Sequence, residues 1–288
     1  MCRPASFVVT KAKVFWGLRT ESHEEIISEN RLKEMSVRGT PTFVRVEIVP
    51  PKDDWTAPIR KWEYRLDQDL RPQWYDPADC ERRTRAALKC WYKAKVVGEN
   101  QTVTDISGSD TKCYVLGTVE SVSGNGTVKY VSDNGTVKYV SGNGTVKYVH
   151  GNGTVEYVSD NGIVESVSGN GTVRSVVGNG TVEYVSCNGT VEYVSGNGTV
   201  KAVSSNGTVK SVSGNGTVRS VLGNGTVESV YGNGTVKAVF DNGTVKAVFD
   251  NGIVTSWNKL PQKVLQSPTA VLIVRDTTTV KCYTGMPK

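Results

Sequence analysis

Apolar and polar positions recur with a fixed nine-residue period through the middle of the chain. Fifteen Asn-Gly pairs stand at constant spacing, the first at residues 125–126 and the last at 251–252. We number the nine positions of each unit from this Asn. An earlier unit, at residues 116–119, keeps the Gly and lacks the Asn, so the pattern predicts an array of 16 units over residues 116–258. A period of this kind indicates a repeat architecture.

The constant positions of the repeat predict its interior. Position 4 is Val in all 16 units, and position 7 is Val in every unit except the last. Close packing penalises changes of volume, whereas position 5 is almost always charged and positions 6 and 8 vary from small to aromatic residues. We therefore expect positions 5, 6 and 8 to face water. The predicted core of the array is represented by Val128, Val131, Val137, Val140, Val182 and Val185.

The spacing between the two Val residues of a unit leaves two architectures open. Side chains three residues apart point to opposite faces of a flat strand. If the strand bends between positions 5 and 6, both Val side chains point inward, and two units per coil stack into a parallel β-solenoid. If each unit is straight and Asn-Gly forms a hairpin turn, the chain becomes a single-layer antiparallel β-meander. Burial favours the solenoid, because a single layer leaves both Val columns in water.

The Asn-Gly pairs predict the corners of the array. Asn and Gly tolerate positive φ, so Asn125, Gly126, Asn134 and Gly135 are expected at backbone corners. Thirteen units read Asn-Gly-Thr, a formal glycosylation acceptor, which we interpret as a by-product of the corner. Position 9 is Asp in only four units, so the carboxylate ladder that a calcium-binding repeat needs is missing.

Different composition marks the regions on either side of the array. Residues 1–100 predict a small α/β domain that caps the array, with strands in SFVVTKAKVFWG and TFVRVEIV. Short and long helices are expected after Ser22 and Asp76, which are good N-cap residues. Residues 101–115 are interpreted as a transition segment. Residues 259–288 predict a C-terminal β cap with strands at 270–274 and 280–283.

The N-terminal domain also carries the candidate contact residues. Trp, Tyr and Arg favour the centres of protein interfaces, and the long predicted helix has a basic stripe on one face. The candidate partner-binding residues are Trp55, Trp62, Trp74, Arg82, Arg85, Lys89 and Lys93. We recognise no catalytic triad, metal-ligand spacing or phosphate loop in the sequence, so it predicts no catalytic residue, metal or cofactor.

Net charge and cysteine usage narrow the choice of partner and compartment. The chain carries a formal charge of +6, and residues 1–100 hold 19 Lys and Arg against 15 Asp and Glu. This excess is too small to predict nucleic acid binding by itself, so another protein is the expected partner. No signal peptide or membrane span is visible, and none of the six cysteines forms a C-x-x-C pair. These features predict a cytoplasmic protein with reduced thiols, away from membranes.

Two resemblances follow from the repeat. The run VFDNGTVKAVFDNG, residues 239–252, is similar to the nine-residue repeats in the G-box domain of centriolar scaffold proteins. That resemblance covers the array alone and implies a free-standing antiparallel sheet that binds a partner. The whole layout resembles uncharacterised bacterial and phage proteins in which a small α/β domain precedes short Gly-Thr-Val-x-x-Val repeats. It implies a microbial or viral setting and supplies no activity.

The sequence therefore predicts a non-enzymatic scaffold or protein-interaction protein. The array is expected to provide a rigid shape, and the N-terminal domain the specific contact. One alternative is an enzyme within residues 1–100 that uses the array as a spacer. Another is the subunit of a self-assembling fibre, and the pattern leaves both monomer and self-association open.

Overall fold

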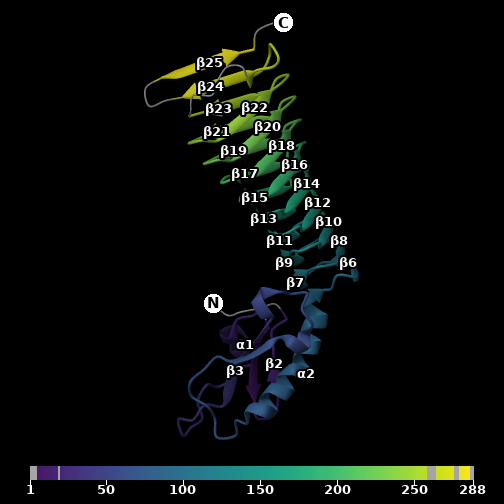
Figure 1. Ribbon diagram of the computed structural model, residues 1–288, viewed down its shortest axis with the longest axis vertical. Coiled ribbons are helices and arrows are strands. Elements are labelled where there is room, and N and C mark those ends of the chain that lie inside the picture. The colour runs from purple at the N-terminus through teal and green to yellow at the C-terminus, as the bar shows by residue number, and fades with distance from the viewer. Residues whose placement is uncertain (1–4, 19, 258–263, 276–278, 286–288) are drawn as a thin grey trace. The chain divides into compact units, whose positions relative to one another are not determined.

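The computed structural model describes residues 5–18, 20–257, 264–275 and 279–285. It divides into two compact units, an N-terminal unit (Met1–Val96) and a solenoid unit (Val97–Lys288) (Figure 1). The boundary falls close to the predicted end of the α/β domain at residue 100. Of the predicted C-terminal cap, residues 259–263, 276–278 and 286–288 lie outside the described residues.

The N-terminal unit is built on a four-stranded antiparallel sheet with the strand order β2-β1-β3-β4. Four successive residues of β1 are buried, so both faces of this strand are covered. The elements of the unit are β1 (Ser6–Thr10), β2 (Val14–Phe15), α1 (His23–Glu29), β3 (Phe43–Val49), η1 (Pro51–Asp53), η2 (Ile59–Lys61), β4 (Glu63–Leu66) and α2 (Pro77–Lys95).

Both helices begin at the predicted N-cap residues. The Ser22 side chain accepts a hydrogen bond from the Glu25 backbone N–H, and the Asp76 side chain accepts one from the Asp79 N–H. Helix α2 buries Cys80, Thr84, Leu88, Trp91 and Lys95 on one face. In the part of the chain that the structure describes, no helix has the length and apolar character needed to cross a membrane.

The solenoid unit consists of two sheets that the chain enters alternately. The nine-stranded sheet contains β6 (Thr102–Ile106), β8 (Thr118–Val122), β10 (Thr136–Val140), β12 (Thr154–Val158), β14 (Thr172–Val176), β16 (Thr190–Val194), β18 (Thr208–Val212), β20 (Thr226–Val230) and β22 (Thr244–Val248). The 12-stranded sheet contains β5 (Val96–Val97), β7 (Thr111–Val115), β9 (Thr127–Val131), β11 (Thr145–Val149), β13 (Ile163–Val167), β15 (Thr181–Val185), β17 (Thr199–Val203), β19 (Thr217–Val221), β21 (Thr235–Val239), β23 (Ile253–Ser256), β24 (Val271–Arg275) and β25 (Val280–Thr284).

Neighbouring array strands are parallel and 18 residues apart, so two units make one coil. Strand β10 pairs with β12 through positions 3, 4, 6 and 7, and position 5 has no partner in this register. The strand therefore bends at position 5, and Val137 and Val140 are both fully buried despite their odd spacing. The predicted solenoid is confirmed, and the parallel register excludes the meander. All six Val residues predicted for the core have no exposed surface.

The corners lie where predicted, but the reason given for their glycine was wrong. Gly126 N–H donates to the Ser123 carbonyl at 2.8 Å, which closes the turn from position 8 to position 2. Positive φ occurs at position 9, as at Gly124 and Asp133, and not at Asn125 or Asn134. At Gly126 and Gly135, a Cβ would instead collide with a backbone carbonyl of an earlier strand. Position 2 is thus Gly because two backbones approach closely there.

The predicted transition segment, residues 101–115, belongs to the solenoid. Strand β6 pairs in parallel with β8, and β7 pairs in parallel with β9. The turn between β6 and β7 repeats the corner hydrogen bond, because the Asp110 N–H donates to the Ser107 carbonyl at 3.0 Å. This coil lacks the Asn-Gly signature, so the period in the sequence did not reveal it.

The C-terminal strands extend the 12-stranded sheet and close the core. Strand β24 is parallel to β23, and β25 is antiparallel to β24. Both lie within one residue of their predicted bounds. Val264, Ala270 and Leu272 are buried against the Val core. These residues complete the apolar interior at its C-terminal end, as expected of a cap.

Apolar side chains replace Ser at position 8 in the last units, at Leu222, Tyr231, Phe240 and Phe249, and Trp257 occupies position 7 of the final unit. They divide into two rows, because consecutive units belong to different sheets. Tyr231 stacks on Phe249 with centroids 4.7 Å apart, and Phe240 stacks on Trp257 at 6.0 Å. Tyr231 is 38% exposed and Trp257 46% exposed, so the described part of the tail leaves both open to solvent.

Candidate interaction surfaces

The tryptophans predicted to contact a partner are mostly core residues. Trp62 is 1% exposed and Trp55 8% exposed, and their rings meet edge to face at 5.1 Å. The Trp62 indole N–H donates to the Ala57 carbonyl at 2.9 Å, which satisfies its polar atom inside the unit. Trp74 is half-buried. The expectation of a tryptophan-rich surface was therefore wrong for Trp55 and Trp62, because burying these rings stabilises the fold.

The basic residues of α2 are brought together, but they differ in their surroundings. Arg85 is half-buried, pairs with Glu81 at 2.7 Å and donates to the Trp62 carbonyl at 3.1 Å. Arg82 is 73% exposed and pairs with Asp79 at 2.5 Å. Lys89 and Lys93 are exposed. The helix thus presents its cationic face to solvent, and Arg85 has a structural role within it.

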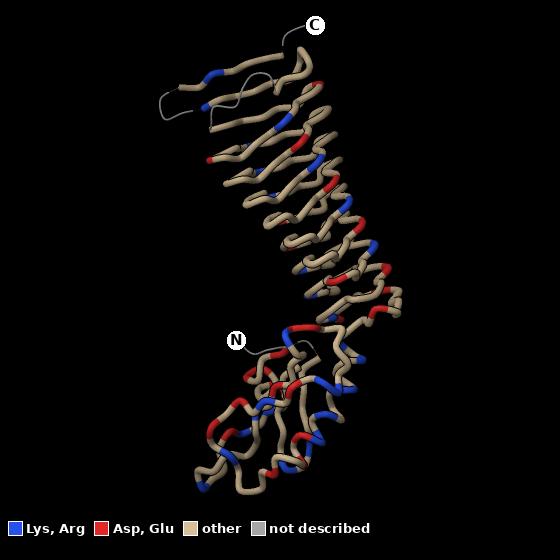
Figure 2. Tube along the Cα trace, viewed as in Figure 1, with Lys and Arg blue, Asp and Glu red and all other residues tan. Residues whose placement is uncertain are grey.

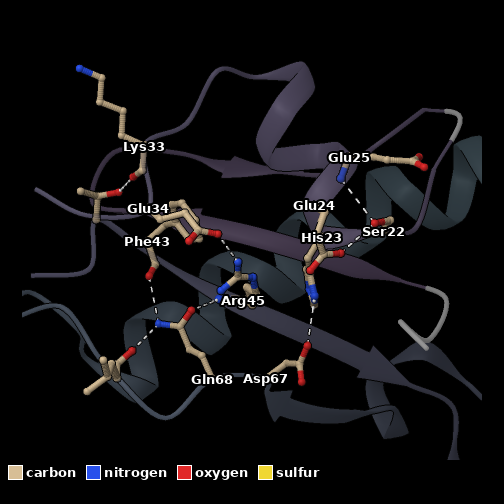
Figure 3. A network of polar contacts seen from close by, with 12 residues as sticks. Ser22, His23, Glu24, Glu25, Lys33, Glu34, Phe43, Arg45, Asp67 and Gln68 are labelled. Carbon is tan, nitrogen blue, oxygen red and sulfur yellow. Dashed lines mark hydrogen bonds and ion pairs between the residues drawn. The ribbon is translucent and has the colours of Figure 1, made fainter.

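A cavity of about 270 Å³ opens beside β3, and sequence reasoning missed it. Arg45 lies at its centre, where its guanidinium pairs with Glu34 at 2.5 Å and lies 5.5 Å from the centroid of the Phe43 ring (Figure 3). The Gln68 amide bridges the backbone, because it accepts from the Arg45 N–H at 2.9 Å and donates to the Phe43 carbonyl at 3.1 Å. Exposed Asp69 and half-exposed apolar side chains complete the lining.

This cavity combines both charges with apolar walls. The Arg45 Nε is buried without a hydrogen-bond partner, and its guanidinium is otherwise neutralised by Glu34. Met35 is 48% exposed and Leu70 65% exposed at the rim. Such a site can hold the side chain of a docking protein. No local sequence motif predicts this cavity, because its residues come from three separate segments of the chain.

A buried histidine links α1 to strand β3 of the sheet. The His23 ring is fully buried, with Nδ1 3.2 Å from the Asp67 carboxylate and Nε2 3.1 Å from the Val46 carbonyl oxygen (Figure 3). Both ring nitrogens face acceptor oxygens, so the ring links α1 to β3 and to the residue that follows β4. Sequence reasoning noticed His23 as the start of a helix and gave no indication of Asp67.

Two titratable groups near α2 are held in their neutral forms. Burial raises the pKa of the Cys80 thiol, and burial likewise raises the pKa of the Tyr64 phenol. Cys80 therefore stays a thiol at neutral pH and behaves as a small apolar core residue. Cys80, Cys90, Cys187 and Cys282 are free thiols, and Cys2 lies outside the described residues.

Position 5 of the array forms a charged row on each sheet. On the nine-stranded sheet the row alternates in sign without exception, as the colours along one edge of Figure 2 show. Ion pairs join coils 18 residues apart, such as Lys210 with Glu192 at 2.9 Å and Lys246 with Glu228 at 3.1 Å. The whole row reads Glu120, Lys138, Glu156, Arg174, Glu192, Lys210, Glu228 and Lys246.

The corresponding row on the 12-stranded sheet has a different order. It places like charges next to each other, in blocks of two or three. Ion pairs occur where blocks meet, as between Lys147 and Glu165 at 3.7 Å, and between Lys201 and Glu183. The row reads Lys129, Lys147, Glu165, Glu183, Lys201, Arg219 and Lys237. The difference between the two rows was hidden in the sequence, because consecutive units alternate between sheets.

Aromatic side chains at position 6 also stack along the sheets. Tyr130 and Tyr148 lie 5.1 Å apart on the 12-stranded sheet, and Tyr139 and Tyr157 lie 5.3 Å apart on the nine-stranded sheet. The stacked rings are 18 residues apart, so every second unit contributes to the same row. Tyr184 is 57% exposed. These rings give both sheets an aromatic surface next to the charged row.

Comparison of the chain with protein-family models, curated proteins and solved structures found no match. The surfaces described above are therefore interpreted from their own geometry. Among the described residues, no group of three metal-ligating side chains lies close enough together to hold an ion.

Proposed function

We propose that the chain is a scaffold that binds other proteins and presents its contact residues on a rigid support. The observation that carries this proposal is the in-register stacking of the array on a fully buried Val core. Parallel coils packed in this way hold the outward side chains at positions 5 and 6 in rows of constant spacing, about 4.8 Å per coil. Rows of fixed spacing suit recognition of an extended partner surface.

The N-terminal unit is the proposed source of the specific contact. Its α2 helix presents exposed Lys89 and Lys93, and its Arg45 cavity has half-exposed apolar residues at the rim. Exposed cationic side chains and apolar pockets are both common components of protein interfaces. The solenoid then serves as the support that carries this contact.

Affinity capture with the full chain tests the proposal. The wild type is compared with Lys89→Glu/Lys93→Glu, and with Lys11→Glu/Lys13→Glu as the matched control. Both pairs are exposed on the N-terminal unit and change the net charge equally. We expect a defined set of proteins, identified by mass spectrometry, to be retained by the wild type and the control and lost by the α2 variant. Retention of the same set by all three chains places the contact elsewhere, and capture of no specific protein contradicts the scaffold function.

A further inference from the structure

The position-5 row of the 12-stranded sheet is complementary to itself. Its first four members are two cations followed by two anions, namely Lys129, Lys147, Glu165 and Glu183. Consecutive members lie on neighbouring parallel strands, from β9 to β15. When this block is turned end to end, each cation meets an anion. A two-fold axis perpendicular to the row, between β11 and β13, performs this operation.

We propose that this face of the solenoid binds a second copy of the chain in an antiparallel, two-fold symmetric dimer. Lys129 then lies opposite Glu183 of the second copy, and Lys147 opposite Glu165 of the second copy. Symmetry repeats both contacts, so four opposite-charge contacts form. The Lys147–Glu165 pair already present within each chain joins its symmetry mate in a cluster of four alternating charges.

Two antiparallel registers place charges of opposite sign against each other. The first is the register described above. The second is displaced by four coils and pairs Glu165 with Arg219 and Glu183 with Lys201 of the second copy, but it brings Lys147 against Lys237 of the second copy. From the first register, a slip by one coil in one direction brings Lys147 against Lys147 of the second copy. A slip in the other direction brings Glu165 against Glu165 of the second copy. A parallel arrangement places every charge against its own kind. Like charges in contact are unfavourable, so the block order fixes the antiparallel orientation, and it favours the first register, in which no like charges of the row meet.

The alternating row on the nine-stranded sheet does not have this property. Each of its charges has an opposite charge one coil away within the same chain, as in the Lys210–Glu192 pair. The electric fields of neighbouring opposite charges cancel within a short distance of the surface. In addition, an alternating row is complementary to itself in many registers. Blocks of like charge leave a stronger field outside the molecule, which can steer a second copy.

The tyrosines beside the charged block fit the same axis. Tyr130, Tyr148, Ser166 and Tyr184 occupy position 6 on the same four strands. The two-fold operation places Tyr148, which is 42% exposed, opposite the small Ser166 of the second copy. Tyr184, which is 57% exposed, then faces Tyr130 of the second copy. Exposed tyrosines of this kind are favoured at interface centres.

The extent of the block predicts a weak, salt-sensitive contact. Four coils span about 19 Å along the row, at about 4.8 Å per coil. This length is short for an interface of standard size, which buries about 800 Å² on each partner. Screening by salt weakens contacts between exposed charges, so the dimer should dissociate as ionic strength rises. This inference rests on the charged row and does not depend on the proposed partner of the N-terminal unit.

Charge-swapped full-length chains test the dimer by sedimentation velocity at low salt. Lys129→Glu/Lys147→Glu/Lys201→Glu/Arg219→Glu makes the row acidic from β9 to β19, and Glu165→Lys/Glu183→Lys makes the whole row basic. We expect the wild type to self-associate, each variant alone to sediment as a monomer, and their equimolar mixture to form a species of twice the monomer mass. Circular dichroism verifies that each variant keeps its sheet content.

The matched control is Glu156→Lys/Glu192→Lys on the nine-stranded sheet, which changes the net charge as the basic variant does. It should self-associate like the wild type. A wild type that stays monomeric at low salt overturns the proposal. Self-association of both swapped variants alone, absence of a complex in their mixture, or loss of association in the control also overturns it.

Discussion

Gly216 passes so close to the carbonyl oxygen of Val194 that a Cβ on residue 216 would lie 2.6 Å from that oxygen. Gly216 lies in the corner between β18 and β19, and Val194 is the last residue of β16. Strand β16 is the neighbour of β18 in the nine-stranded sheet. The backbone continues from there into the ladder, where the Thr217 N–H donates to the Gly198 carbonyl at 2.9 Å. The constant spacing of the coils and the glycine at position 2 thus have one physical cause.

Replacing Gly216 with Ala should destabilise the solenoid unit. The added Cβ meets backbone, which moves less readily than a side chain, so we expect a loss of about 1–3 kcal/mol in the free energy of unfolding. Urea denaturation followed by circular dichroism measures the change. Ser211→Ala, at an outward position of a nearby strand, is the control and should have little effect. Equal stability of Gly216→Ala and wild type would show that the coils can separate freely there.

Replacing Ser205 with Gly should stabilise the chain. Ser205 occupies position 9 with φ of 53°, in the left-handed region where most other units have Gly. Relief of this backbone strain is worth about 1 kcal/mol. Cys187, with φ of 48°, offers a second test of the same kind through Cys187→Gly. Thermal unfolding of the two variants should show higher midpoints, and a lower midpoint in both would contradict the assigned backbone conformation.

Reversing one charge in the alternating row should cost stability through both neighbours. In Lys210→Glu, the new carboxylate replaces the pair with Glu192 and adds repulsion from Glu228. Water screens these exposed groups, so the loss should be at most about 1 kcal/mol. The double swap Glu192→Lys/Lys210→Glu restores that pair, but it places the new Lys beside Arg174 and the new Glu beside Glu228. Urea titrations should therefore find the swap less stable than wild type at low salt, and full recovery would show that the row acts as isolated pairs.

His150 should make stability depend on pH. Burial lowers the pKa of His150 below its ordinary value of 6.5, and the Asp133 carboxylate opposes this shift only in part. Between the lowered pKa and 6.5, the unfolded chain binds more protons than the folded chain, so stability rises with pH through this window and falls on acidification.

Comparison of wild type with His150→Ser isolates this contribution, because Ser occupies position 8 in most units. Urea midpoints are measured at a pH above the ordinary histidine pKa and at a pH below it. The difference between the two chains should change in favour of the variant as pH falls. A stability difference that stays constant across this pH range would contradict the effect of burial on the pKa of His150. The variant also loses the contact between the His150 and Tyr130 rings, whose centroids are 5.8 Å apart, and this loss shifts its stability at every pH.

Much of the fold was predictable because it follows from local patterns. The helix caps at Ser22 and Asp76 and the Val pairs of the repeat are each signalled by a few neighbouring residues. The candidate sites were not, because their members come from distant segments. The pairing of His23 with Asp67 and the place of Trp62 in the core depend on how β4 and α2 pack, which no short motif records.

The sequence alone determined which side chains of the array face inward, since constant Val residues and variable charged residues distinguish inside from outside. It could not determine which units are neighbours. Which units are neighbours depends on the backbone hydrogen bonds between coils. These bonds pair the strand of Lys210 with the strand of Glu192, and not with the strand of the adjacent unit in the sequence. Only the tertiary structure therefore decided that one charged row alternates and is paired within the chain, while the other is ordered in blocks that can meet a second copy.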